Sequence, residues 1–354
     1  MSAQQASHRK PVLEHRFAAL DGIRSLAAIA VVLDHLQIVN AGWTGVDFFF
    51  VLSGFLITSI LRRTRDDRSY YSEFWFKRVT RIMPPLVLCL LALVLFQSMS
   101  LRWAFICLLT GGDIAAAYMK PFLPAASPLW SLAVEEHFYF VWPFAVRLLP
   151  RRALLALLAL LIVGEPILRA VYTFVGHPTW DIVYFLTQFR LDGLAMGALL
   201  AICFERPKQM DAIGNYSTVL TAVTAVVFVG LRVLLGLRFT RQGNTPLYNA
   251  LSYFLVAMTA FWCIAFLQTH RTSWVTRALS WSPLVWVGQI SYGLYLYHTI
   301  VLSLLLQHTT LSPPAIMLLT ILISVVIAFA SFRFIESPLI AWGRKKAEEL
   351  RRRP

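Results

Sequence analysis

Long apolar segments alternate with short polar connections along almost the whole chain. A membrane-spanning helix needs about 20 mostly apolar residues. Candidate segments cover residues 20–40, 44–61, 84–101, 103–118, 130–149, 152–172, 183–204, 217–236, 247–268, 284–306 and 313–335. Lipid admits only helices or closed barrels, and these segments are too long for barrel strands. The pattern therefore predicts an all-α integral membrane protein.

The basic residues between the segments indicate how many of them cross the membrane. The N-terminal segment and residues 344–353 are both basic, so the positive-inside rule places both termini in the cytoplasm. The most basic connection, residues 62–81, then also lies inside. The segment at 103–118 is short and contains a Gly-Gly-Asp interruption, so we expect it to be re-entrant or interfacial. About ten transmembrane helices remain, with both termini cytoplasmic.

The composition agrees with a membrane protein. Of 354 residues, 58% are hydrophobic and only 14% are charged, against about 45–50% and about 25% in soluble domains. The net charge of +14 comes from basic clusters between apolar segments, so we expect the bilayer, and not nucleic acid, as the partner. The four cysteines lie in apolar segments without CxxC spacing, which predicts buried thiols and no metal site. We expect a cytoplasmic tail at 1–17, a membrane domain at 18–340 and a basic cytoplasmic tail at 341–354.

Ionisable side chains within apolar segments are costly, so each is a functional candidate. Arg24 and His35 are eleven residues apart in the first segment, which places them on one helix face, about 16 Å apart. Asp21 lies one turn from Arg24 and is expected to pair with it. His35 is a candidate for acid–base chemistry, and the alternative is a histidine that only hydrogen-bonds between helices.

The next two segments carry polar residues near their starts. Asp47 lies near the start of the second segment, where Gly54 is expected to permit close helix packing and Ser53 to bond a backbone carbonyl. Arg78 and Arg81, at i and i+3 by the entrance to the third segment, present two guanidiniums on one face. Such a pair suits phosphate oxygens or anionic lipid head groups, and the spacing alone leaves both alternatives open.

The fourth predicted span carries a polar and aromatic stripe. Ser131, Glu135 and Tyr139 recur at helical spacing, whereas Glu136 and His137 are rotated away from them. A buried carboxylate on this stripe can accept from an imidazole or hold an arginine. Glu135 is therefore a candidate for catalysis or for structural pairing.

Later segments complete the set of intramembrane polar residues. Arg190 and Asp192 lie in one segment, and His298 in another is a second candidate for acid–base chemistry. Arg333 and Glu336, at i and i+3, are expected to neutralise each other.

These residues lie in motifs that resemble acyltransferase family 3, bacterial membrane acyltransferases of envelope polysaccharides. The pair Arg24 and His35 is followed, in the family's order, by GVDFFFVLSGFLI, RVTR, PLWSLAVEEHFYFVWP, RLDGLAMGALLA, ISYGLYLYHT and FIESP. The resemblance covers nearly the whole chain and implies a ten-span domain that uses cytoplasmic acyl-CoA, most often acetyl-CoA. It also implies that His35 is essential, that Arg24 supports it, and that Arg78 and Arg81 lie near the CoA phosphates.

The resemblance implies an O-acyltransferase of the bacterial inner membrane that acylates a hydroxyl of a glycan or lipid-linked saccharide. Some family members carry a C-terminal extracytoplasmic hydrolase-like domain, and this sequence is expected to be a stand-alone member. The acceptor must then reach the membrane site itself, or a separate acyl-accepting protein must carry the group. The alternative is a proton-coupled transporter, which also uses intramembrane His, Glu and Arg.

Overall fold

The computed structural model describes residues 17–119, 123–234 and 244–352. The α-helices in these ranges are α1 (Ala18–His35), α2 (Thr44–Arg63), α3 (Tyr70–Phe96), α4 (Leu101–Leu108), α5 (Gly112–Tyr118), α6 (Leu129–Leu148), α7 (Arg151–Gly176), α8 (Trp180–Phe185), α9 (Leu191–Cys203), α10 (Pro207–Leu234), α11 (Pro246–Thr269), α12 (Trp274–Leu279), α13 (Ser282–His308), α14 (Pro313–Ser331) and α15 (Ser337–Arg352). Two 3-10 turns, η2 (Pro124–Ala126) and η3 (Thr187–Phe189), and a π-helical turn, η4 (Phe332–Glu336), complete them. These ranges contain no strand. The predicted N-terminal tail lies outside the described residues, apart from Phe17.

Seven of the described helices are long and apolar enough to cross a membrane: α2, α3, α7, α10, α11, α13 and the continuous run from α14 into α15. Three others that correspond to predicted spans are more polar or shorter, because α1 and α6 carry charged residues and α9 has only 13 residues. The helical multi-pass fold is confirmed, and the count of ten spans stays a prediction. Helices α4 and α5, of 8 and 7 residues, are each at most about 12 Å long, too short to cross.

Two helices extend beyond their predicted boundaries. Helix α3 begins at Tyr70 and runs through the Pro84-Pro85 pair, so it starts well before the predicted residue 84. Pro84 and Pro85 lack the N–H groups that would bond the carbonyls of Thr80 and Arg81, and membrane helices tolerate prolines where neighbouring groups compensate. The helix is tied to α13 at the next carbonyl, that of Ile82, which accepts from the Tyr292 hydroxyl at 3.0 Å. The last helix continues through η4 into α15, which packs along α3. The predicted C-terminal tail is therefore helical as far as Arg352.

The predicted helix at 183–204 is broken into α8, η3 and α9. The carboxylate of Asp113 accepts from the backbone N–H and the hydroxyl of Thr187, at 3.2 and 2.8 Å. The carboxylate of Glu165 accepts the N–H of Asp192 at 2.9 Å. Carboxylates from α5 and α7 thus accept from backbone N–H groups that would donate to backbone carbonyls in a continuous helix.

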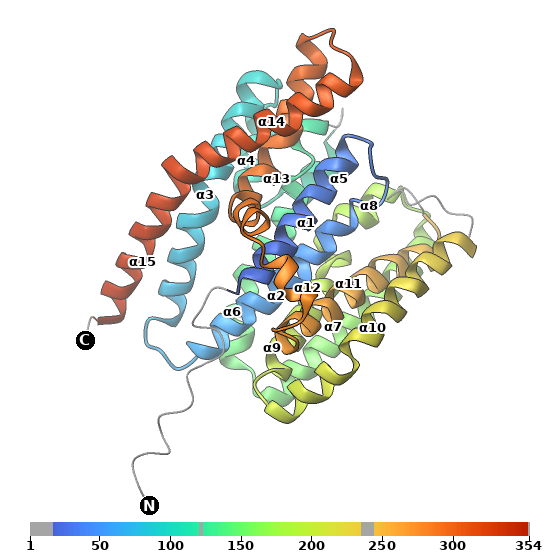
Figure 1. The fold of residues 1–354 in the computed structure, drawn as a ribbon, viewed down its shortest axis with the longest axis vertical. Coiled ribbons are helices and arrows are strands. Elements are labelled where there is room, and N and C mark those ends of the chain that lie inside the picture. The colour runs from blue at the N-terminus through green and yellow to red at the C-terminus, as the bar shows by residue number, and fades with distance from the viewer. Residues whose placement is uncertain (1–16, 120–122, 235–243, 353–354) are drawn as a thin grey trace, which may run out of the picture.

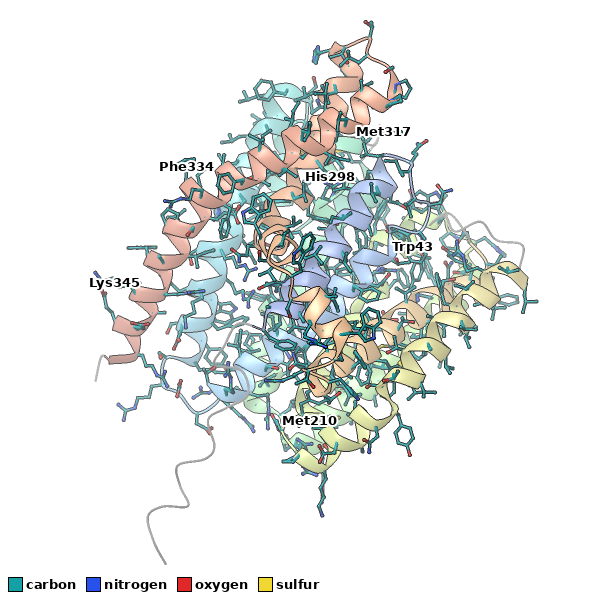
Figure 2. All side chains as sticks on the ribbon, in the orientation of Figure 1. Trp43, Met210, His298, Met317, Phe334 and Lys345 are labelled. Carbon is teal, nitrogen blue, oxygen red and sulfur yellow. The ribbon has the colours of Figure 1, made fainter. Side chains whose placement is uncertain are left out.

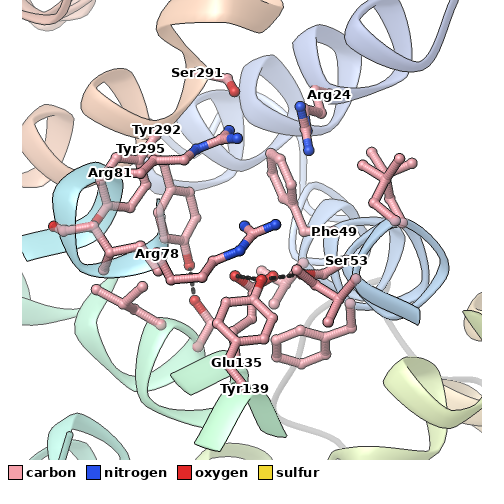
Figure 3. Close-up of a pocket in the computed structure, with 18 residues that line it drawn as sticks. Arg24, Phe49, Ser53, Arg78, Arg81, Glu135, Tyr139, Ser291, Tyr292 and Tyr295 are labelled. Carbon is pink, nitrogen blue, oxygen red and sulfur yellow. Dashed lines mark hydrogen bonds between the residues drawn. The ribbon is translucent and has the colours of Figure 1, made fainter. Parts of the chain in front are cut away.

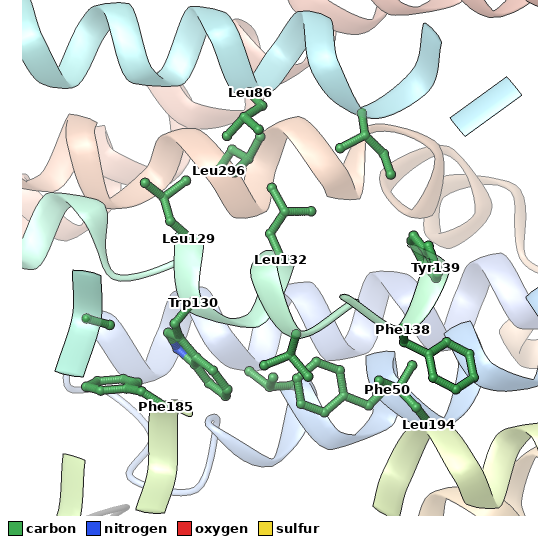
Figure 4. Packing of buried hydrophobic residues seen from close by; sticks show 14 of the residues in the cluster. Phe50, Leu86, Leu129, Trp130, Leu132, Phe138, Tyr139, Phe185, Leu194 and Leu296 are labelled. Atoms are coloured by element: carbon green, nitrogen blue, oxygen red, sulfur yellow. The ribbon is translucent and has the colours of Figure 1, made fainter. Parts of the chain in front are cut away.

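Figure 1 shows α1 and α2 in the middle of the molecule, with α3 and the α14–α15 run on one side and α7, α10 and α11 on the other. Phe334 and Lys345 lie along that outer run, whereas His298 lies between the helices (Figure 2). Helix α6 is central to the packing. Leu132 faces Leu86 and Leu296 of α3 and α13, and Trp130 turns the other way, toward Phe50 of α2 (Figure 4).

Helices α2 and α9 approach each other closely through two glycines. A Cβ added to Gly54 would lie 2.0 Å from the Leu194 carbonyl oxygen, and one added to Gly197 would lie 1.9 Å from the Val51 carbonyl oxygen. Side chains cannot occupy such distances without moving the backbone. The predicted packing role of Gly54 is confirmed.

We expect Gly197→Ala to destabilise the fold by about 1–3 kcal/mol or more, because it overpacks the α2–α9 contact. The matched control is Gly230→Ala in α10, where nothing lies within 4 Å of an added Cβ. Thermal unfolding of both purified variants in detergent tests this. Equal unfolding temperatures would contradict the α2–α9 packing.

We also expect the α13–α14 connection and α15 to lie on opposite sides of the membrane, because the basic α15 belongs inside by the positive-inside rule. In intact cells, Thr310→Cys should react with a membrane-impermeant maleimide, and Lys345→Cys should react only after permeabilisation. The unmodified chain is the control for its own cysteines. Labelling of Lys345→Cys in intact cells would overturn the ten-span arrangement.

Candidate active site

A cavity of about 870 Å³, including its open mouth, lies between α1, α2, α3, α6 and α13. Its polar lining residues are Arg24, Ser53, Arg78, Arg81, Ser131, Glu135, Tyr139, Ser291, Tyr292 and Tyr295 (Figure 3). Apolar side chains, mostly from α2, fill the remaining wall. The cavity brings together predicted residues from three different segments: Arg24, the Arg78 and Arg81 pair, and the stripe of α6.

The cavity carries an excess of positive charge. Arg24 pairs with Asp21 at 3.4 Å, as predicted. The guanidinium of Arg78 lies 5.2 Å from the centre of the Tyr139 ring. Neither Arg78 nor Arg81 forms an ion pair with a carboxylate in the described ranges, and Glu135 is the acidic side chain among the residues that line the cavity. Three guanidiniums and one carboxylate side chain around this cavity favour an anionic ligand.

Glu135 is held by a short hydrogen-bond chain. The Tyr139 hydroxyl donates to its carboxylate at 3.1 Å, and Ser53 bonds the same hydroxyl (Figure 3). The prediction that Ser53 bonds a backbone carbonyl is therefore wrong, because a hydroxyl from α6 lies within its reach. Ser131, on the same stripe, bonds the hydroxyl of Tyr295 at 2.5 Å.

His35 and His298 form a second polar group next to the cavity. His35 is the last residue of α1, and its Nδ1 lies 3.0 Å from the Val31 carbonyl oxygen and 3.3 Å from Nε2 of His298. Nδ1 of His298, a fully buried residue, lies 2.9 Å from the Tyr295 carbonyl oxygen. Because carbonyl oxygens only accept, these contacts place a proton on Nδ1 of each ring. Nε2 of His35 is then an acceptor, 3.4 Å from Oγ of Ser127.

The two predicted candidate histidines thus lie together. Neither lines the cavity that contains Arg24, Arg78 and Arg81, which we call the arginine cavity. Tyr295 separates the two groups, since it lines the cavity and its ring centre lies 6.2 Å from that of His298. Arg24 and His35 are separated along α1 by eleven residues, or about 16 Å. They cannot act on the same atom.

A third polar cluster, built on buried pairs of arginine and aspartate, lies behind the cavity wall. Asp47 pairs with Arg190 at 2.7 Å, and Arg169 pairs with Asp192 at 2.7 Å. Arg190 also lies 4.2 Å from the centre of the Tyr253 ring. Asp47, predicted as a supporting site residue, therefore lies outside the cavity. Sequence reasoning missed Arg169, although its i, i+4 spacing from Glu165 within an apolar segment was a visible signal.

The predicted Arg333–Glu336 pair is not formed. Both residues lie in the π-helical turn, where residues three apart are not aligned as they are in an α-helix. The Glu336 carboxylate accepts instead from the Ser331 hydroxyl at 3.0 Å. His137 is turned off the α6 stripe, as predicted, and lies 2.7 Å from the Thr187 hydroxyl.

Comparison with known proteins identifies relatives of this chain. A family model described as an acyltransferase domain matches residues 17–333. The chain is 31% identical over 359 residues to YrhL of Bacillus subtilis (strain 168), covering 93% of the chain and 56% of the relative. It is 31% identical over 354 residues to the peptidoglycan O-acetyltransferase OatA of Listeria monocytogenes, covering 91% and 55%. It is 29% identical over 353 residues to the O-acetyltransferase OatA of Staphylococcus aureus, covering 92% and 57%. The chain thus spans little more than half the length of these relatives, and no solved structure matches it.

Proposed function

The chain belongs to acyltransferase family 3, and we propose that it is an O-acetyltransferase of the bacterial inner membrane that uses acetyl-CoA. The proposed acceptor is a hydroxyl of a cell-envelope glycan, and the names of the OatA relatives support peptidoglycan or a related saccharide. Family membership does not favour the alternative of a proton-coupled transporter.

The arginine cavity is the observation that carries this proposal. CoA bears several phosphate charges at one end and its thioester at the end of a long flexible arm. Arg78 and Arg81 lack an ion partner within the described part of the chain, and planar guanidiniums bind phosphate oxygens through paired hydrogen bonds. The proposed role of Arg78, Arg81 and Arg24 is therefore to hold the donor.

The histidine pair supports the second half of the reaction. Nε2 of His35 is oriented as an acceptor by the contacts of Nδ1, so it can take the proton of an attacking hydroxyl. His298 holds the imidazole of His35 in that tautomer through Nε2. The thioester arm would extend from the arginines past Tyr295 toward this pair, with the acetyl group at its tip.

A transfer assay tests the function directly. The full chain, purified in lipid nanodiscs, is mixed with radiolabelled acetyl-CoA and soluble peptidoglycan fragments. We expect label on the glycan, released as acetate by mild base. Hydrolysis of acetyl-CoA without glycan labelling, or no reaction with any envelope saccharide tested, would overturn the proposal.

We expect His35→Ala to lower turnover by about 10²–10⁴-fold, the contribution of a general base, while the protein still inserts and accumulates. The control is His308→Ala, which removes an exposed imidazole at the end of α13. Retention of more than about a tenth of wild-type turnover by His35→Ala would exclude His35 as the base.

We expect Arg78→Lys and Arg81→Lys each to raise the KM for acetyl-CoA about tenfold, because lysine keeps the charge but loses the planar fork. One charged hydrogen bond is worth about 1.5–3 kcal/mol, and about 1.4 kcal/mol is tenfold in affinity. The KM for acetyl-pantetheine, which lacks the nucleotide phosphates, should change little. Arg152→Lys, an exposed arginine at the start of α7, is the control.

If the pair only anchors the helix to lipid head groups, the outcome differs. Lysine would then be tolerated, the KM for acetyl-CoA would be unchanged and only the protein level would fall. Normal kinetics in the Arg78→Lys, Arg81→Lys double variant would refute the phosphate assignment.

A further inference from the structure

Ser127 lies beside the histidine pair and was not among the residues singled out from the sequence. It is 5% exposed and directly precedes Pro128 and the first turn of α6. Its Oγ lies 3.4 Å from Nε2 of His35. Within the described ranges the hydroxyl has no other hydrogen-bond partner, so its proton is available to that imidazole.

The three side chains form a directed hydrogen-bond chain. Nδ1–H of His298 donates to the backbone of its own helix, at 3.1 Å to Leu294 and 2.9 Å to Tyr295. Nε2 of His298 can therefore accept from Nδ1–H of His35, at 3.3 Å. Nε2 of His35 then accepts from Oγ–H of Ser127. A hydroxyl, an imidazole and a group that orients the imidazole are the arrangement of an activated nucleophile.

The position of Ser127 also suits a thioester that comes from the cavity. Ser131 lines the cavity, and Ser127 lies four residues before it at the same end of α6. The first N–H groups of an α-helix have no partner within the helix, so the start of α6 offers donors next to Oγ. Such donors can stabilise the oxyanion that forms when a hydroxyl attacks a carbonyl.

We propose that Ser127 is an acyl-carrying nucleophile, activated by His35 and positioned by His298; this rests on the proposed function. In the first step Oγ of Ser127 attacks the thioester carbonyl carbon. The C–O bond forms, the C–S bond breaks, and the proton moves from Oγ to Nε2 of His35 and then to the departing CoA thiolate. The products are acyl-Ser127 and free CoA thiol.

In the second step the acceptor hydroxyl attacks the ester carbonyl of acyl-Ser127. His35 takes the proton of the acceptor at Nε2 and returns it to Oγ as the ester C–O bond breaks. The acceptor leaves as its ester and Ser127 is regenerated, so no oxidant, reductant or further reactant is needed. Two simpler schemes, direct transfer with His35 as base and acylation of His35 itself, make no use of the Ser127 hydroxyl.

Trapping of the acyl-enzyme tests the proposal. The full chain in nanodiscs is mixed with radiolabelled acetyl-CoA without acceptor, quenched in acid and digested, and the labelled peptide is sequenced by mass spectrometry. We expect label on the peptide that contains Ser127, stable to acid as an oxygen ester is. Label on a histidine or a tyrosine, or transfer to glycan without protein-bound label, would overturn it.

Variants separate a chemical role from a structural one. Ser127→Ala should lose both the label and about 10²-fold or more of the turnover. Ser127→Cys should regain the label as a thioester that neutral hydroxylamine cleaves, a change that a merely structural role would not produce. The control is Ser324→Ala, which removes a fully buried hydroxyl from α14.

The outcomes also separate this proposal from the function on which it rests. If wild type transfers acetyl and Ser127→Ala keeps more than about a tenth of that rate, the serine relay is wrong and the acetyltransferase stands. If wild type acetylates neither itself nor a glycan, the proposed function fails first.

Discussion

The free-energy cost of burying a charge away from water explains why two buried arginines of this protein have carboxylate partners. Arg169 and Arg190 are almost fully buried, and each is matched by a carboxylate at 2.7 Å. Arg78 and Arg81 reach the cavity without such a match in the described ranges. An unpaired charge in apolar surroundings is strongly unfavourable. The contrast distinguishes buried arginines that are paired within the chain from the cavity arginines, which the proposed function assigns to an anionic ligand.

The buried Asp47–Arg190 pair also shapes the cavity. The guanidinium of Arg190 lies 5.7 Å from the ring centre of Phe50 and 5.5 Å from that of Trp130, and Phe50 lines the cavity wall. Asp47 fixes this guanidinium from α2. The break between α8 and α9 places Arg190 at the start of α9, where it can reach α2 and α6 together. The broken helix is thus part of what holds the wall in place.

Much of this fold could be predicted from hydropathy and charge, because both act locally along the chain. The long helices and the Asp21–Arg24 pair follow from spacing within one segment. The break near Thr187 could not be predicted, because it depends on a carboxylate 74 positions away in sequence. The same holds for Ser127 and His35, which are 92 positions apart. Contacts between residues far apart in sequence determine where apolar segments are interrupted and which hydroxyl lies beside which imidazole.

Helix α1 explains why the site is divided. It carries Arg24 near one end and His35 as its last residue, about 16 Å apart, so one rigid element fixes the distance between the guanidinium in the cavity and the imidazole of the histidine pair. In the proposed function a flexible donor arm would span that gap, and phosphates held at the arginines would stay far from the imidazole proposed to accept a proton. The tautomer of His35 is set by Val31 within α1 and by His298 from α13. Which nitrogen of His35 can accept a proton therefore depends on how α1 and α13 pack.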